Sequence, residues 1–210
     1  MSKPFFSVIV PEHNSSAFMR KGLDTIRNQT FTDYELLIIC DACDDNSVEI
    51  AREYSDRVFI TNARRPCAAR NKGLDEARGT WVMFMDDDDW WMDRNAFQII
   101  ADKVGEHGED VLAFGFYWQS RGVMLPTKEQ PFTAVWHKAW KREFIERIGA
   151  RFPDWEHSDD DGFTKVALPY AKMWFLNQPL YYYNYLRPGS ISQKLQSGEL
   201  QTLEEMGLIE

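Results

Sequence analysis

The sequence predicts an α/β protein built on a mainly parallel β-sheet. Short apolar runs of strand length alternate four times with helical segments between Phe5 and Met85, as expected for repeated strand–helix units. The last run, Trp81–Met85, ends abruptly in four consecutive carboxylates, Asp86–Asp89. Ligands of such sheets bind beyond the carboxyl ends of the strands. The acidic run therefore indicates the edge where a functional site is expected.

Four strands and three helices are expected in the first half of the chain. The strands span residues 5–10, 35–40, 57–61 and 81–85. Ser15 or Ser16 caps the first helix, and the second covers residues 47–54. The apolar face of the first helix is formed by Met19, Leu23 and Ile26. The third helix runs from Pro66 to Gly79, because proline suits the first turn of a helix and glycine its end.

In the second half of the chain, predicted strands and helices alternate less regularly. Its expected elements are a helix at 93–104, strands at 111–118, 122–125 and 181–185, and a turn at 187–192. Another helix, ended by Gly149, is predicted from apolar residues spaced four apart, namely Trp136, Trp140, Phe144 and Ile148. An acidic loop at 155–161 leads into a helix with Phe163, Val166 and Ala167. The tail, 200–210, either packs as a last helix or frays.

The composition limits the classes of protein to consider. A chain of 210 residues fits one globular domain with a real core. Hydrophobic residues make up 44% and charged residues 27%, which is ordinary for a folded protein. The aromatic content of 14%, with eight Trp, favours a groove that stacks rings or sugars. A net charge of -9 argues against a broad nucleic-acid surface, while a local one stays open.

The cysteines and the N-terminus indicate a reduced compartment. Cys40, Cys43 and Cys67 show no disulfide pattern. Cys40 and Cys43 have CxxC spacing, but without a second pair no zinc site is expected. No signal peptide is recognisable, and no apolar run reaches the roughly 18 residues of a membrane span. A cytoplasmic protein is expected.

Acids recur where the predicted strands end. Asp41 follows the second strand, with Asp44 and Asp45 close behind, and Asp86–Asp89 follow the fourth. These acids should meet at one edge of the sheet. Crowded carboxylates repel one another, and Mg²⁺ or Mn²⁺, which prefer oxygen ligands, would relieve that repulsion. The alternative is a solvated acidic turn that caps the next helix.

Four blocks together resemble the family 2 glycosyltransferases, which have the GT-A fold. Residues 7–14 are similar to the family's first strand and Pro-x-x-Asn turn, and residues 35–47 to its second strand and base-binding turn. Residues 69–90 match the Ala-Arg-Asn-x-Gly helix and the DxD strand after it. Residues 152–163, with 187–192 downstream, resemble the acceptor-side acid motif and the closing loop.

The resemblance implies one GT-A domain, residues 1–210, with a nucleotide-sugar-binding half at 1–92 and a smaller acceptor-binding half at 93–210. By resemblance, three residues shape the nucleotide pocket and the base site: Pro11, Asn14 and Asp41. The resemblance also implies that Arg70 contacts the nucleotide or diphosphate, the alternative being a solvated helix arginine. Asp86 is expected near the ribose and the metal, and Asp88 on a Mn²⁺ or Mg²⁺ ion that bridges the diphosphate.

Position along the strand separates the four acids further. Alternate residues at a strand end share a face, so Asp86 and Asp88 are expected to face the ligand. Asp87 and Asp89 are expected to orient the turn and cap the following helix.

The acceptor-side motif implies the general base. By resemblance, Asp160 takes the proton of the attacking hydroxyl, with Asp161 as the alternative in register. Asp159 replaces the family's usual glutamate. A single base without a covalent intermediate implies inversion at the anomeric carbon. Trp155 either stacks on the acceptor or packs in the core. His137 and His157 are metal or phosphate contacts, or else ordinary surface or core histidines.

The substrates follow in outline from the resemblance. The donor is expected to be a UDP-sugar, although Cys40, Ala42, Cys43 and His13 depart from the family's usual base-binding residues. The chain shows neither the membrane helices nor the Gln-x-x-Arg-Trp signature of processive synthases, so single-sugar transfer is expected. The expected acceptor is a hydroxyl on a glycan precursor.

Alternatives remain for both acceptor and class. One alternative acceptor is a hydroxymethylated base in phage DNA, bound by a basic strip of Arg64, Arg65, Lys138, Lys141 and Arg142. A nucleotidyltransferase would share the acidic sheet edge but should carry a Gly-rich basic signature after its first strand. A non-catalytic sugar-binding module would have no need of Asp86, Asp88 and Asp160 together.

Overall fold

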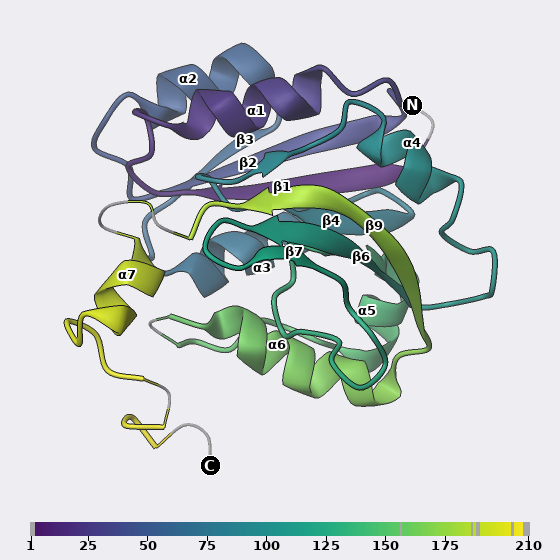
Figure 1. Ribbon diagram of the computed structural model, residues 1–210. Coiled ribbons are helices and arrows are strands. Elements are labelled where there is room, and N and C mark those ends of the chain that lie inside the picture. Colours follow the sequence, from purple (N-terminus) through teal and green to yellow (C-terminus); the bar gives the residue numbers. More distant parts are fainter. Residues whose placement is uncertain (1–2, 156, 186, 188–189, 203, 208–210) are drawn as a thin grey trace.

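A nine-stranded β-sheet with helices on both faces forms the protein (Figure 1). The computed structural model describes residues 3–155, 157–185, 187, 190–202 and 204–207, and the statements below concern these residues. The strands are β1 (Phe6–Glu12), β2 (Tyr34–Asp41), β3 (Val58–Thr61), β4 (Trp81–Phe84), β5 (Trp90–Trp91), β6 (Val111–Trp118), β7 (Gly122–Met124), β8 (Lys138–Lys141) and β9 (Met173–Tyr183). The helices are α1 (Met19–Arg27), α2 (Ser47–Tyr54), α3 (Pro66–Glu76), α4 (Ala96–Ala101), α5 (Arg142–Ile148), α6 (Asp159–Ala167) and α7 (Ile191–Gln196), with a 3₁₀ turn at Leu168–Tyr170.

The strand order brings most carboxyl ends to one edge. The order is β3-β2-β1-β4-β8-β6-β9-β5, with β7 paired to β6. β1 pairs in parallel with β2 and β4, and β2 pairs in parallel with β3. β8 runs antiparallel to both β4 and β6, so β6 and its parallel partner β9 point the same way as β4. The chain therefore enters its loops at the same edge after β1, β2, β3, β4, β6 and β9, where ligands of α/β sheets bind. The predicted mixed α/β fold is confirmed.

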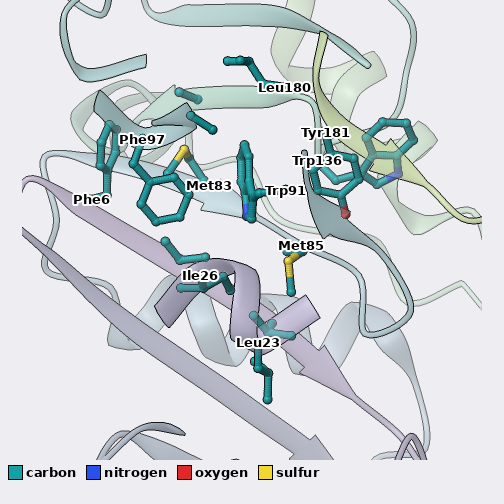
Figure 2. Packing of buried hydrophobic residues seen from close by; sticks show 14 of the residues in the cluster. Phe6, Leu23, Ile26, Met83, Met85, Trp91, Phe97, Trp136, Leu180 and Tyr181 are labelled. Atoms are coloured by element: carbon teal, nitrogen blue, oxygen red, sulfur yellow. The ribbon is translucent and has the colours of Figure 1, made fainter. Parts of the chain in front are cut away.

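Two apolar cores fill the space on either side of the sheet. The first packs α1, α2 and α4 against one face and includes Trp91, Phe97 and Tyr181 (Figure 2). The second packs α3, α5 and α6 against the other face and includes Trp140 and Phe163. β1 supplies both, since Val8 and Val10 lie in the first core and Ile9 in the second, as strand alternation requires. Nothing among the helices of the described residues is both long and apolar enough to cross a membrane.

The predicted helix through Trp136 and Trp140 is wrong at its start. Residues 138–141 form strand β8, and α5 begins only at Arg142. Trp136 lies in the first core, where it stacks on Tyr181 at 4.9 Å (Figure 2), whereas Trp140 lies in the second core. The spacing of four thus did not mark one helix face. The predicted end at Gly149 is confirmed, with a left-handed φ of 65°.

Other element boundaries differ from the predicted ones. α3 ends at Glu76 rather than at Gly79. A Cβ at Gly79 would lie 2.4 Å from the Ser7 nitrogen, so this glycine allows two backbones to approach. α4 is shorter than predicted, and β9 begins at Met173, well before the tyrosines. Of the predicted turn at 187–192, residues 188–189 lie outside the described residues, as do 203 and 208–210 of the tail.

Candidate active site

The acidic run forms a tight turn at the carboxyl edge. β4 stops at Phe84, and the Asp89 amide donates to the Asp86 carbonyl oxygen at 3.2 Å. The prediction that strand alternation selects Asp86 and Asp88 is therefore wrong in its premise, because the run is not a strand. Asp86, Asp87 and Asp88 all line the same cavity.

This cavity has a volume of about 600 Å³ and opens at the carboxyl edge of the sheet. Its walls come from the turns after β1, β2 and β4, from the start of α3, from the end of β9 and from the segment around α7. The residues predicted for the donor and the metal all line it: Pro11, Asn14, Asp41, Arg70, Asp86 and Asp88. Asp160 is not among the lining residues.

Asp41 is held by the segment after β3. The Asp41 carboxylate accepts hydrogen bonds from the Thr61 hydroxyl at 2.8 Å and from the Ala63 and Arg65 amides, both at 2.7 Å. Both of its oxygens thus have protein partners. A carboxylate carries about four lone-pair positions, so capacity remains for one further donor from a ligand.

The turns after β1 and β2 are tied together beside Asp41. Asn14 has a positive φ of 52°, and its side-chain oxygen accepts from the Asp44 amide at 2.8 Å. His13 Nδ1 lies 2.7 Å from the Asp41 carbonyl oxygen. Pro11 pairs with Ile39 in the sheet register. One wall of the cavity is therefore built from two interlocked turns.

Arg70 joins the two acid motifs. Its guanidinium donates to both oxygens of Asp159 at 2.7 and 2.9 Å and to Asp86 at 2.8 Å. Arg70 is 8% exposed, so the alternative of a solvated helix arginine is wrong. Burial disfavours the charged guanidinium, but Asp159 and Asp86 outweigh it and raise the Arg70 pKa. Its Nε has no hydrogen-bond partner among the described atoms.

Arg187 provides the counter-charge for Asp88. Its Nε lies 2.5 Å from an Asp88 carboxylate oxygen, and both side chains are at most one quarter exposed. Within the described residues Asp87 forms no ion pair. Burial, followed by repulsion from Asp88, raises the Asp87 pKa to about 8, although the charge of Arg187 acts to lower it. The acidic turn is thus only partly neutralised by protein groups.

Asp89 has a role that differs from the predicted helix cap. It is fully buried and accepts from the Tyr181 hydroxyl and the Asn184 amide, both at 2.8 Å. The Tyr181 oxygen also accepts from the Asp86 amide at 3.1 Å. Burial, followed by repulsion from neighbouring acids, raises the Asp89 pKa well above its usual value. Asp89 therefore fixes the acidic turn to the end of β9.

The acceptor-side acids form the first turn of α6. This end of a helix favours negative charge, and the helix is anchored by Phe163, which stacks on Phe152 at 4.3 Å. Arg70 holds both oxygens of Asp159, whereas the Asp160 carboxylate accepts, among the described residues, from the Asp161 amide alone, at 3.1 Å. Burial, followed by repulsion from Asp159, raises the Asp160 pKa to about 7. Such a pKa suits a general base at neutral pH.

Lys138 and His137 are both fully buried. Lys138 Nζ donates to the Phe132 and Ala134 carbonyl oxygens at 2.7 Å each and lies 2.7 Å from His137 Nε2. Burial lowers the pKa of both groups. Lys138 therefore does not belong to the basic strip predicted for nucleic acid, and His137 is a core histidine.

His157 does line the cavity, although the main chain already engages it. Its Nε2 donates to the Gln201 carbonyl oxygen at 2.7 Å, and its Nδ1 lies 3.0 Å from the Ser158 hydroxyl. Trp155 packs against α6, since a Cβ on Gly162 would lie 3.0 Å from its ring. Both residues thus have structural contacts of their own.

Several cavity residues were missed as individual site residues. Tyr183, Asn184, Arg187 and Lys194 line the cavity from the end of β9 and from the segment beyond it. The sequence did carry a signal, because the block that resembles the family's closing loop begins with Arg187. Which acid this arginine would meet was not readable from the chain order.

The donor set fits a divalent cation that a substrate helps to bind. The described residues contain no group of three or more His, Cys, Asp or Glu side chains placed to hold a metal ion. Mg²⁺ is often held by one or two carboxylates together with substrate phosphates. Asp86 and Asp88 could supply such carboxylates, since both line the cavity.

Comparison with known protein families identifies the family of this chain. The family model for Glycosyl transferase family 2 matches residues 7–168. The chain belongs to this family.

Two curated relatives from Bacillus subtilis strain 168 match over most of the chain. The putative glycosyltransferase EpsH is 27% identical over 224 residues, covering 93% of this chain and 65% of the relative. The uncharacterized glycosyltransferase EpsJ is 29% identical over 220 residues, covering 90% of this chain and 63% of the relative. The chain thus spans just under two thirds of the length of these relatives.

Solved structures share the fold. S. aureus TarS 1–349 in complex with UDP-GlcNAc superposes with a TM-score of 0.79 at 23% identity, over 90% of this chain and 60% of that one. The mannosyltransferase PcManGT from Pyrobaculum calidifontis, in complex with GDP-Man and Mn²⁺, gives a TM-score of 0.71 at 19% identity. The match covers 95% of this chain and 62% of that one. The GT-A fold is therefore confirmed.

Proposed function

We propose that the protein transfers one sugar from a UDP-sugar to an acceptor hydroxyl, with inversion at the anomeric carbon and with a divalent cation at the acidic turn. The observation that carries this proposal is the Arg70 bridge. It holds Asp86 of the donor motif and Asp159, the neighbour of Asp160, on one guanidinium. A donor site and a base would therefore lie on opposite sides of one fixed group.

The donor would occupy the cavity beyond β1, β2 and β4. Asp41 offers its remaining acceptor capacity to the ring N–H of a uracil. Cationic side chains that line the same cavity suit a diphosphate: Arg64, Arg65, Arg70, Arg187 and Lys194. The TarS complex with UDP-GlcNAc supports a nucleotide-sugar in this fold.

A Mn²⁺ or Mg²⁺ ion would be held by Asp86 and Asp88. When bound, it would neutralise charge on the departing nucleoside diphosphate. Asp88 would have to exchange Arg187 for the cation or share it. Arg187, once displaced, would be available to the diphosphate.

Asp160 would act as the general base. Its raised pKa keeps the carboxylate basic enough to accept a proton from a sugar hydroxyl. Asp159 is less suited, because Arg70 occupies both of its oxygens. We propose a saccharide hydroxyl as acceptor. The burial of Lys138 shortens the basic strip that a DNA acceptor would need.

Incubation with a panel of nucleotide sugars, with and without Mn²⁺, tests the proposal. Release of UDP that depends on the cation and is lost in Asp160→Asn is expected. An absence of nucleoside diphosphate from every donor, under both conditions, would count decisively against enzymatic sugar transfer by this chain.

A further inference from the structure

A pair of cysteines lies behind the donor cavity. Cys40 is fully buried near the end of β2, and Cys43 is partly exposed in the turn that follows. The chain reverses at Ala42, whose φ is 52°, and the Ala42 amide donates to the Thr61 carbonyl oxygen at 2.8 Å. This reversal brings Cys43 back towards the strand it has just left.

The contact of Cys43 with β1 places it beside Cys40. Cys43 Sγ lies 3.5 Å from the Glu12 carbonyl oxygen, and Glu12 is the register partner of Cys40 across β1 and β2. The two thiols are also close enough for each to shift the pKa of the other. Both side chains lie on the α1 and α2 side of the sheet, where Cys40 belongs to the core and Cys43 packs against it.

The two thiols differ in reactivity. The Cys40 thiol, helped by the Asn14 amide and by His13, lowers the Cys43 pKa to about 7 against the effect of burial. The Cys43 thiol, together with burial, raises the Cys40 pKa. Since the thiolate is the reactive form, Cys43 is the sulfur that an oxidant meets first and Cys40 the one positioned behind it.

Cys43 also lies at the junction of the two turns that line the donor cavity. Besides the contact of Cys43 with Glu12, the Asp44 amide donates to the Asn14 side chain and His13 contacts the Asp41 carbonyl oxygen. A bond that draws the Cys43 sulfur towards Cys40 would pull it away from Glu12 and Asn14. The shape of the cavity wall therefore depends on the state of this sulfur.

We propose that Cys40 and Cys43 are a redox-active pair, in which hydrogen peroxide oxidises Cys43, Cys40 closes a disulfide, and the disulfide disturbs the wall of the donor cavity. In the first step the Cys43 thiolate attacks one peroxide oxygen, giving a sulfenic acid and hydroxide. In the second step the Cys40 sulfur attacks Cys43, the S–S bond forms and water leaves. Overall, two thiols lose two hydrogens and one peroxide becomes two waters.

Mass spectrometry of the peroxide-treated chain tests the chemistry. Trypsin releases residues 28–52 as one peptide that contains both Cys40 and Cys43. After remaining thiols are blocked with iodoacetamide, this peptide is expected unalkylated and two hydrogens lighter. Cys67, buried and with its pKa raised by burial, is the internal control and should stay alkylatable after denaturation.

Matched variants assign the two roles. Cys43→Ser should give no disulfide, while Cys40→Ser should stop at a sulfenic acid that dimedone traps on Cys43. Cys40→Ala repeats the second test without placing a hydroxyl in the core. Cys67→Ser should behave as the wild type. The proposal of a redox-active pair is overturned if Cys40 and Cys43 are both recovered as alkylated thiols, or if Cys67 is oxidised before Cys43.

Hydrogen exchange and UDP binding test the consequence. In the oxidised protein the Asp44 amide should exchange faster, and UDP should bind about tenfold or more weakly by calorimetry, both reversed by a phosphine reductant. A disulfide that leaves exchange at residues 12–15 and 41–46 unchanged overturns the coupling. Only the UDP readout rests on the proposed function. A reduced protein that fails to bind UDP contradicts that function, whereas mass spectrometry and hydrogen exchange still test whether Cys40 and Cys43 form a redox-active pair.

Discussion

One guanidinium nitrogen of Arg70 contacts both carboxylate oxygens of Asp159, 89 residues further along the chain, at 2.7 and 2.9 Å. The Arg70 side chain is 10% exposed and the Asp159 side chain 3%. The pair connects α3 to the first turn of α6, and the same guanidinium also holds Asp86. The acids assigned to the donor side and to the acceptor side are therefore positioned by one residue.

Replacing Arg70 should be costly for stability. Arg70→Met leaves Asp159 and Asp86 without their shared counter-charge, and removing one partner of a buried pair typically costs about 3–5 kcal/mol. Urea unfolding at pH 7 should show a loss in this range. Arg70→Lys, which keeps the charge but not the fork, should lose less.

The exposed pair of Arg20 and Glu53 provides the control, with side chains 47% and 52% exposed. Arg20→Met should leave the free energy of unfolding nearly unchanged, because solvent screens such pairs. A cost for Arg70→Met no larger than that for Arg20→Met would show that the bridge does not stabilise the fold.

Asp160→Asn should abolish transfer while donor binding stays near that of the wild type. General-base catalysis contributes about 10²–10⁴-fold, so the turnover rate should fall by at least the lower value. Calorimetric titration with UDP supplies the binding control. If Asp161→Asn loses transfer and Asp160→Asn does not, the base is one residue further along.

The raised Asp160 pKa gives opposite pH trends for rate and stability. The base must be deprotonated, so transfer should rise with pH through about 7. The pKa in the folded chain exceeds its ordinary value of 3.8, so between these values the folded state holds a proton that the unfolded state has lost. This contribution makes the free energy of unfolding fall as pH rises through that window.

The same variant tests the stability trend. Asp160→Asn cannot titrate, so its stability relative to the wild type should increase from pH 5 to pH 8, as followed by urea unfolding. A pH-independent difference would mean that the Asp160 carboxyl titrates at its ordinary value in the folded chain.

Asp88→Asn should weaken UDP binding that depends on Mn²⁺. The substitution removes the negative charge and one ligand oxygen, and Arg187 loses its ion-pair partner at 2.5 Å. Calorimetry with and without Mn²⁺ separates the two effects, since loss of the ligand affects only the cation-dependent part. Equal affinity of wild type and variant in Mn²⁺ would remove Asp88 from the metal site.

Gly22→Ala should destabilise the protein although alanine favours helices. A Cβ at Gly22 would lie 2.5 Å from the Asp89 carbonyl oxygen and 2.9 Å from Met85. Overpacking of this kind typically costs about 1–3 kcal/mol, more than the gain of about 1 kcal/mol in helix propensity. Thermal unfolding should show a lower midpoint. A raised midpoint would mean that α1 moves away from the acidic turn without cost.

Local sequence patterns were enough to predict much of the fold. β2 and β6 and helix α2 lie within a residue of their predicted positions, because each is a short apolar run or an amphipathic turn with clear flanking residues. The failure at Trp136 and Trp140 has a physical cause. Two tryptophans four residues apart were assigned to one face, whereas the chain passes from one side of the sheet to the other between them.

The sequence by itself determined the strand–helix order, the acids that would meet at the carboxyl edge, and the resemblance to family 2 glycosyltransferases. These features depend on residue type and spacing along the chain. Only the tertiary structure decided which partner each acid meets. Arg70 binds Asp86 and Asp159, Arg187 binds Asp88, and the neutral Tyr181 hydroxyl donates to Asp89. Those pairings join residues far apart in sequence, and burial sets both their strength and their pKa values, so no local pattern contains them.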